Sequence, residues 1–292
     1  PIDDFLSSKP TAKDLQETRA RLEQSLQETR KQNHALYQQL MIYDKHPRLD
    51  IWRSELIWAW NQALWDAPSK VLSKGEPDPQ LLLTTQLAPE LTGVSKELIM
   101  ISAYFVPGQP GLVYLTGRAD AGVTVSLLTN SLEATDVPAV HGGYAPYRKA
   151  LLEHGVKLFE LRRQPGEGGG SGPNLFRRSA YQGSDSSLHS KAMIFDQKKS
   201  FIGSFNFDPR SVLWNTEVGV LVDSPELAAH VRELALQGMA PPLSYEAKLQ
   251  DGKVVWVTED DGKMHTLSKE PGSLWRRFNA WFSTTVGLER ML

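Results

Sequence analysis

Two short apolar segments joined by a turn, with polar residues at their free ends, constrain this chain most. Ala192–Phe195 is continuously apolar and Ser200–Gly203 starts a second such run, with Gln197, Lys198 and Lys199 between them. A short apolar run of this kind predicts a buried strand. Pairing of the two strands would bring four polar groups to one point: His189, Lys191, Ser204 and Asn206.

An imidazole, an ammonium, a hydroxyl and a carboxamide together suit an anionic phosphoryl group. The imidazole can attack or transfer protons, while the other groups hold the oxygens as charge builds. Alone, each residue has a simpler interpretation, because a single His near a strand is usually structural and G-S-x-N is usually a turn. The full spacing H-x-K-x4-D-x6-G-S-x-N, from His189 to Asn206, rarely arises by chance.

This pattern resembles the signature of the phospholipase D superfamily. Flanking segments resemble bacterial cardiolipin synthases, most closely the C-terminal half of the C type, over roughly residues 98–237: Ala103–Gly108, Gly122–Asn130, Val140–Arg148, Gly155–Glu160, Phe207–Ser211 and Asn215–Glu217. The resemblance implies an α/β fold, a phospholipase D-like sheet flanked by helices.

The resemblance also implies a double displacement through a phosphohistidine, with no metal or cofactor. Enzymes of this family build one active site from two such motifs, and this chain matches the second. His189 would be the general acid/base partner by position, although the symmetry leaves the nucleophile role open. The resemblance also implies roles for the other residues. Lys191 and Asn206 would bind phosphoryl oxygens, and Ser204 would support them. Glu217 would orient an imidazole, and Asp196 would fix the turn of the motif.

Only one motif is present in this chain. None of the histidines other than His189 is followed two residues later by lysine, and the first residue is Pro1. We therefore expect a piece that lacks the first repeat. The leading function is transfer of a phosphatidyl group between phosphatidylglycerol and a second phospholipid to form cardiolipin. The alternatives are a single-motif phosphodiesterase or nuclease completed by a second copy of the chain, and a half-enzyme that is inactive alone.

Alternating strands and helices place the motif in a larger sheet. Buried strands are predicted at Leu98–Phe105, Val123–Leu128 and Val156–Leu161, with helices between them. This order implies a mostly parallel sheet, with sites at the carboxyl ends of its strands. Tyr104, Asn130 and the segment 140–144 are therefore candidates for a pocket rim, and His141 is a weaker candidate for contact with substrate.

The N-terminal region is expected to be helical. Residues 1–47 predict a helix capped by Thr11 and Asp14, either packed on its own domain or forming a coiled-coil dimer. A tryptophan-rich stripe from Trp52 to Trp65 predicts a second helix, which packs in the core or touches lipid. Residues 69–79 predict a linker, so we divide the chain into 1–80, a catalytic repeat at 81–240 and a tail at 241–292.

Later segments leave further alternatives open. Residues 164–187 are rich in glycine and flanked by arginines, which predicts a surface linker or a lid over the site. Asp-Gly pairs at 251 and 261 predict a small β-meander over residues 245–268. Residues 273–292 predict an amphipathic helix with Leu274, Phe278 and Trp281 on one face and Arg276 and Arg277 off it, lying on an anionic membrane or packing in the core.

Composition limits the partners. The net charge is −2, so no global basic field recruits nucleic acid, and the absence of cysteine excludes disulfides and thiolate metal sites. No apolar run approaches the ~20 residues of a membrane-spanning helix. The resemblance to bacterial cardiolipin synthases then implies a peripheral protein at the cytoplasmic side of the bacterial inner membrane.

Overall fold

The computed structural model describes residues 11–32, 56–163 and 188–286, and the chain divides into two compact units, residues 1–58 and 59–292. In the first unit, helix α1 (Ala12–Gln32) begins at a capping box. Asp14 N donates to Thr11 Oγ1 at 3.2 Å, and Thr11 N donates back to Asp14 Oδ2 at 2.8 Å. The predicted helix is confirmed over this range; its remaining parts, 1–10 and 33–47, lie outside the described residues.

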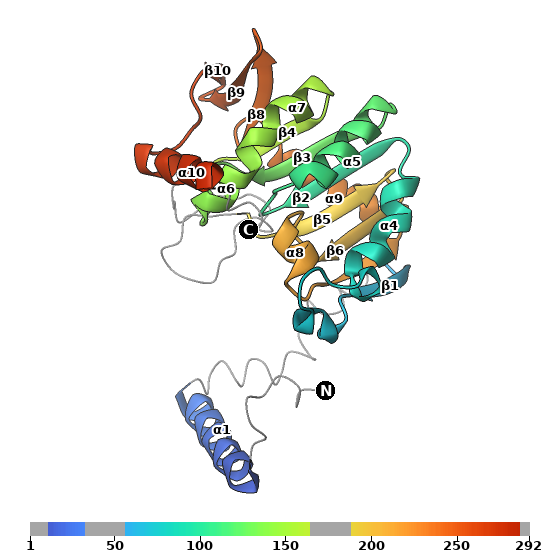
Figure 1. The fold of residues 1–292 in the computed structure, drawn as a ribbon, viewed down its shortest axis with the longest axis vertical. Helices are drawn as coiled ribbons and strands as arrows, with labels where there is room; N and C mark the ends of the chain where they lie inside the picture. The colour runs from blue at the N-terminus through green and yellow to red at the C-terminus, as the bar shows by residue number, and fades with distance from the viewer. Residues whose placement is uncertain (1–10, 33–55, 164–187, 287–292) are drawn as a thin grey trace. The chain divides into compact units, whose positions relative to one another are not determined.

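The second unit is built on one ten-stranded sheet with the order β1-β7-β6-β5-β2-β3-β4-β8-β9-β10 (Figure 1). Its strands are β1 (Trp60–Trp65), β2 (Glu97–Ser102), β3 (Thr124–Asn130), β4 (Lys157–Leu161), β5 (Lys191–Phe195), β6 (Lys199–Gly203), β7 (Val218–Asp223), β8 (Ser244–Gln250), β9 (Lys253–Asp260) and β10 (Lys263–Leu267). Helices flank the sheet, which confirms the predicted α/β class.

The prediction of a mostly parallel sheet is wrong. Among the described strands, only the β2–β3 and β3–β4 pairs are parallel, and the other neighbours run antiparallel. A parallel pair needs a long crossover, whereas a turn of a few residues can only reverse the chain, so β5–β6, β8–β9 and β9–β10 are antiparallel hairpins. The pairs β1–β7, β2–β5 and β4–β8 join strands far apart in sequence, and only the tertiary fold decides their direction.

Helices cover both faces of the sheet. They are η3 (Pro68–Leu72), η4 (Pro79–Leu81), α4 (Leu83–Gly93), α5 (Gly108–Asp120), α6 (Pro138–Tyr144), η5 (Ala145–Tyr147), α7 (Arg148–Glu153), α8 (Pro209–Leu213), α9 (Pro225–Gly238) and α10 (Leu274–Val286). Along β2, Leu98 and Met100 join one buried cluster, and Ile99 and Ile101 join the other. Successive side chains of a strand point to opposite faces, so a continuously apolar strand indicates burial on both.

The tryptophan-rich segment is a strand and not the predicted helix, at least over 60–65. β1 pairs with β7 from Trp60↔Asp223 to Trp65↔Val218, with Leu64 buried and Trp60 and Trp65 exposed. A partner about 155 residues away in sequence decides its conformation, which local periodicity cannot reveal. The break between the two units consequently falls at 58/59, upstream of the boundary expected at residue 80. Trp52 lies outside the described residues.

The predicted meander is confirmed and extends the main sheet, because β8 pairs with β4. Both turns have positive φ at their two central residues: 53° and 71° at Asp251 and Gly252, and 50° and 73° at Asp261 and Gly262. This is the geometry that favours Asp-Gly in two-residue hairpins.

Within the described ranges, no helix combines the length and the apolar character needed to cross a bilayer.

Candidate active site

The hairpin β5–β6 creates the site edge. Ala192 pairs with Ile202 and Phe195 with Lys199, so residues before β5 and after β6 lie at the same edge of the sheet. β7 starts at this edge, since Gly203 pairs with Gly219. The structure therefore gathers five of the predicted residues there: His189, Lys191, Ser204, Asn206 and Glu217. β2 also ends at this edge, with Ser102 opposite Lys191.

Lys191 is a buried ammonium behind an exposed imidazole. The side chain of His189 is exposed, and Lys191 Nζ donates to the main-chain oxygen of His189 at 2.6 Å. Burial lowers the pKa of Lys191, while the negative charges of Glu217, Asp136 and Asp208 act in the opposite direction. The site thus carries a cation set beside carboxylates and an accessible histidine.

Ser204 and Glu217 form a coupled pair between β6 and β7. Ser204 Oγ donates to Glu217 Oε2 and accepts from Val218 N at 3.1 Å, and Glu217 is buried. Within the described part of the chain, Glu217 bonds to Ser204 and not to the ring of His189. Its expected role in orienting an imidazole stays a prediction and would concern the partner motif.

Asn206 is fixed at the site edge through its side-chain oxygen. The side chain is buried, and its Oδ1 accepts from Tyr104 N at 3.2 Å. Its Nδ2 donates to no group among the residues that the structure describes. A fixed N–H donor of this kind suits a phosphoryl oxygen.

Asp196 lies away from the other candidates. It follows the far end of β5, roughly 17 Å from Lys191 by the rise of an extended strand. Its carboxylate accepts from the backbone amides of Ser95, Lys96 and Glu97 at 2.7–3.2 Å. Burial alone would raise the pKa of Asp196, but these bonds outweigh it and the pKa lies below its usual range. The residue holds the turn against β2, so it does not belong with the catalytic group.

A buried ion pair, missed in the sequence, supports Glu217. Asp66 and Lys70 are 5% and 2% exposed, and Lys70 Nζ lies 2.8 Å from Asp66 Oδ2. Asp66 also accepts from Glu217 N at 2.8 Å and from Leu83 N at 2.6 Å. Lys70 lies in residues 69–79, which were predicted to be a linker, whereas Asp66 precedes them. The i, i+4 spacing of the two opposite charges was the only available signal.

Two of the predicted rim residues hold the loops at the edge. Tyr104 Oη donates to Asp136 at 2.8–2.9 Å, and burial raises the pKa of Tyr104 above its usual value. Asn130 is buried; its Nδ2 donates to Ala103 O and Leu188 O, and its Oδ1 accepts from Leu188 N. The residue before His189 is therefore tied to the end of β3.

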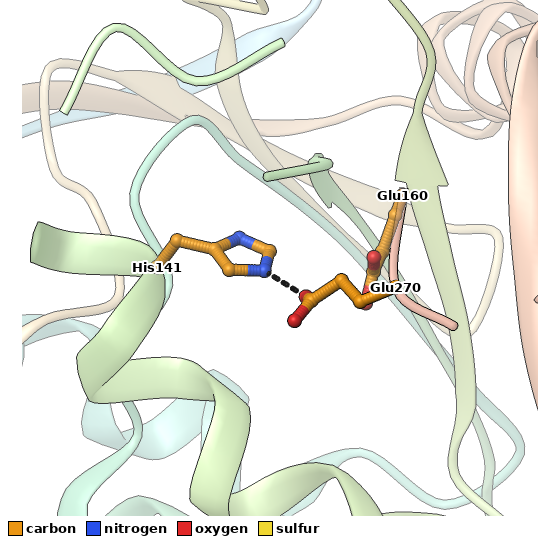
Figure 2. Close-up of side chains that lie close together, drawn as sticks. All are labelled: His141, Glu160 and Glu270. Carbon is orange, nitrogen blue, oxygen red and sulfur yellow. Dashed lines mark hydrogen bonds and ion pairs between the residues drawn. The ribbon is translucent and has the colours of Figure 1, made fainter. Parts of the chain in front are cut away.

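His141 belongs to a buried network and not to the site rim. It is 4% exposed, and its Nε2 lies 2.6 Å from Glu270 Oε1, with Glu160 nearby (Figure 2). Arg148 donates from Nε to Glu160 at 2.7 Å, and its Nη2 contacts both Glu270 and His141. His141, Glu160 and Glu270 resemble a ligand set, but the guanidinium already supplies their cation. The predicted contact of His141 with substrate is not supported.

Glu270 is firmly ionised in this network. Burial alone would raise the pKa of its carboxyl, but the charge of Arg148 and the hydrogen bond with His141 bring it to about 2.

The predicted lid, 164–187, lies outside the described residues. Arg162, which precedes it, donates to Asp260 Oδ1 at 2.7 Å and to Thr258 Oγ1 at 3.1 Å.

Comparisons with known proteins show the family and the fold. The family described as cardiolipin synthase, PLD-like domain matches residues 87–237. Cardiolipin synthase C of Escherichia coli is 37% identical over 239 residues, which cover 81% of this chain and 49% of that protein. An uncharacterized protein of Helicobacter pylori is 32% identical over 204 residues, covering 68% and 37%.

Among solved structures, the phosphatidylserine synthase of Haemophilus influenzae has a similar fold. The TM-score is 0.50 at 11% identity, and the match covers 80% of this chain and 48% of that one. The chain thus spans about half of that protein, and half or less of the two relatives it matches.

Proposed function

Because the chain belongs to the family of cardiolipin synthase PLD-like domains, we propose that it transfers phosphatidyl groups between phospholipids to form cardiolipin, supplying the second of two catalytic motifs. The observation that carries the proposal is the single edge that holds an exposed His189, a buried Lys191 and the amide nitrogen of Asn206, which donates to none of the described residues. These are a proton carrier or nucleophile and two donors for phosphoryl oxygens.

The proposed chemistry has two displacements. In the first, one imidazole attacks the phosphorus of a donor phospholipid, the bond to the leaving alcohol breaks, and a second imidazole protonates that alcohol. In the second displacement, the imidazole that protonated the alcohol takes a proton from the acceptor hydroxyl. The acceptor oxygen attacks the phosphorus of the phosphohistidine, and the bond from phosphorus to the attacking imidazole breaks. His189 is one of the two, while Lys191 and Asn206 hold the non-bridging oxygens.

The Ser204–Glu217 pair would act on the partner motif. Glu217 is buried and bonded through one oxygen to Ser204. A carboxylate held in this way can accept the ring N–H of an imidazole and stabilise its charged form. We assign this role to Glu217 toward the histidine that this chain lacks.

An exposed apolar patch beside the site supports completion by another domain. The patch consists of Ile202 on β6 (42% exposed), Val218 and Val220 on β7 (56% and 39%) and Trp65 on β1 (53%). The patch adjoins the pair described above, because Val218 N donates to Ser204 Oγ. Its partner is the first repeat of the complete enzyme or, in the phosphodiesterase alternative, a second copy of the chain.

The test compares the chain alone with the chain co-expressed with a first repeat. We expect transfer of labelled phosphatidylglycerol to be weak or absent for the chain alone and restored by the first repeat. In the complete enzyme His189→Ala should lower turnover by about 10³-fold or more, because partners in a coupled pair do not substitute for each other. His154→Ala is the matched control, since the ring of His154 is exposed and, among the residues that the structure describes, bonds Asp120 alone.

Mass in solution separates the alternatives. Activity from a dimer of this chain would favour the phosphodiesterase, and strong transfer by a strictly monomeric preparation would refute the need for two histidines. Near-normal turnover of the His189→Ala enzyme would remove that residue from the mechanism.

A further inference from the structure

Helix α10 is attached to the domain by its polar side. Arg276 Nη1 donates to Leu132 O at 3.1 Å and to Thr135 O at 2.5 Å. Arg277 Nη2 donates to Glu270 O at 2.6 Å, and Thr284 Oγ1 donates to Gly142 O at 2.7 Å. The two arginines that were expected to face anionic lipid are therefore used inside the protein.

The opposite side of α10 is apolar and exposed. Its side chains, named here the aromatic face, are Leu274 (82% exposed), Trp275 (69%), Phe278 (50%), Trp281 (60%) and Phe282 (50%). The ring of Phe278 lies 5.8 Å from that of Trp275, 5.9 Å from that of Trp281 and 6.3 Å from that of Phe282. An ordinary surface helix buries its apolar stripe and exposes its charges, and α10 does the reverse.

The helix that carries the aromatic face is attached next to the catalytic edge. α10 packs on α6, which follows the end of β3 (Figure 1). The carbonyls that hold Arg276 belong to Leu132 and Thr135, next to Asp136. Asp136 in turn bonds Tyr104 and acts electrostatically on Lys191. The helix is thus fixed to the segment that borders the phosphoryl site.

We infer that the aromatic face of α10 inserts into the interface of a phospholipid membrane and holds the catalytic edge at the headgroups. The inference rests on the proposed function, which requires that edge to meet phospholipid. Tryptophan rings, apolar with one polar N–H, suit the level between headgroups and acyl chains. The five side chains that make up the aromatic face are all uncharged, so binding should come mainly from apolar insertion and depend little on salt.

The test measures vesicle binding, which needs no turnover. The full chain is sedimented with phosphatidylglycerol–phosphatidylethanolamine vesicles, and we expect Trp275→Ser/Phe278→Ser/Phe282→Ser to reduce the bound fraction at least tenfold. The matched control changes three equally exposed apolar residues elsewhere, Leu72→Ser/Val113→Ser/Met264→Ser, and should bind like wild type. Raising salt from 0.1 to 0.5 M should change binding less than threefold. Circular dichroism and the thermal midpoint verify that both variants fold.

Several results would overturn the inference: no binding by wild type, equal binding by the two variants, or a wild-type dimer that the α10 variant dissociates, since a second copy would then cover the face. The His189→Ala chain should bind vesicles normally. If the complete enzyme makes no cardiolipin while the α10 variant still loses binding, the proposed function fails and the membrane inference stands.

Discussion

Replacing Asp66 should test whether the buried ion pair supports the site. Asp66→Ala removes the counter-ion of Lys70, which is 2% exposed, and the acceptor of two backbone amides, those of Leu83 and Glu217. Among the described residues, the ammonium of Lys70 would keep one hydrogen bond, its donation to Ser211 O at 3.0 Å.

The expected cost is large because one charge stays buried without its partner. Removing one member of a buried pair typically costs about 3–5 kcal/mol. For a unit of this size, each kcal/mol lowers the melting temperature by about 2–4 °C, so we expect a fall of roughly 6–20 °C. In the complete enzyme, turnover should fall as well, since the backbone of Glu217 loses its anchor.

Urea unfolding followed by tryptophan fluorescence gives the free energy of unfolding. The matched control is Asp260→Ala, which breaks the pair of Arg162 with a half-exposed carboxylate and should cost about 1 kcal/mol or less. Lys70→Met and the double variant complete a cycle, in which we expect a coupling of at least about 1 kcal/mol. A cost for Asp66→Ala no larger than that of Asp260→Ala would refute the reasoning.

Burial raises the pKa of Asp208 to about 6, so the folded protein holds a proton that the unfolded chain releases above pH 4. Relative to Asp208→Asn, wild type should therefore lose about 1–3 kcal/mol of stability between pH 4 and 6, as urea midpoints of the two proteins will show. Asp196→Ala should cost about 1–3 kcal/mol of stability but leave kcat of the complete enzyme intact; a loss of kcat like that of His189→Ala would contradict its structural role. A Cβ on Gly142 would overlap the carbonyl of Ala280, so Gly142→Ala should make α10 more sensitive to limited proteolysis, whereas Gly117→Ala, in open space on α5, should not.

The sequence alone determined the parts of the site that depend on neighbouring residues. The continuous apolar run before Asp196, the turn after it and the two-residue spacing of Ser204 and Asn206 predicted β5, β6 and their shared edge. The Asp-Gly turns of the meander were equally visible. Strand burial and turn type are set by a few adjacent side chains, so they can be recognised without a partner.

Tertiary structure alone decided what depends on distant partners. The conformation of residues 60–65 is set by pairing with β7. Whether neighbouring strands run parallel or antiparallel depends on which strands the tertiary fold places side by side. The support of Glu217 by Asp66 spans a separation of 151 residues. The sequence showed that α10 is amphipathic, but not which side faces outward. That orientation follows from the carbonyls of Leu132 and Thr135, which capture Arg276 and leave the aromatic rings exposed.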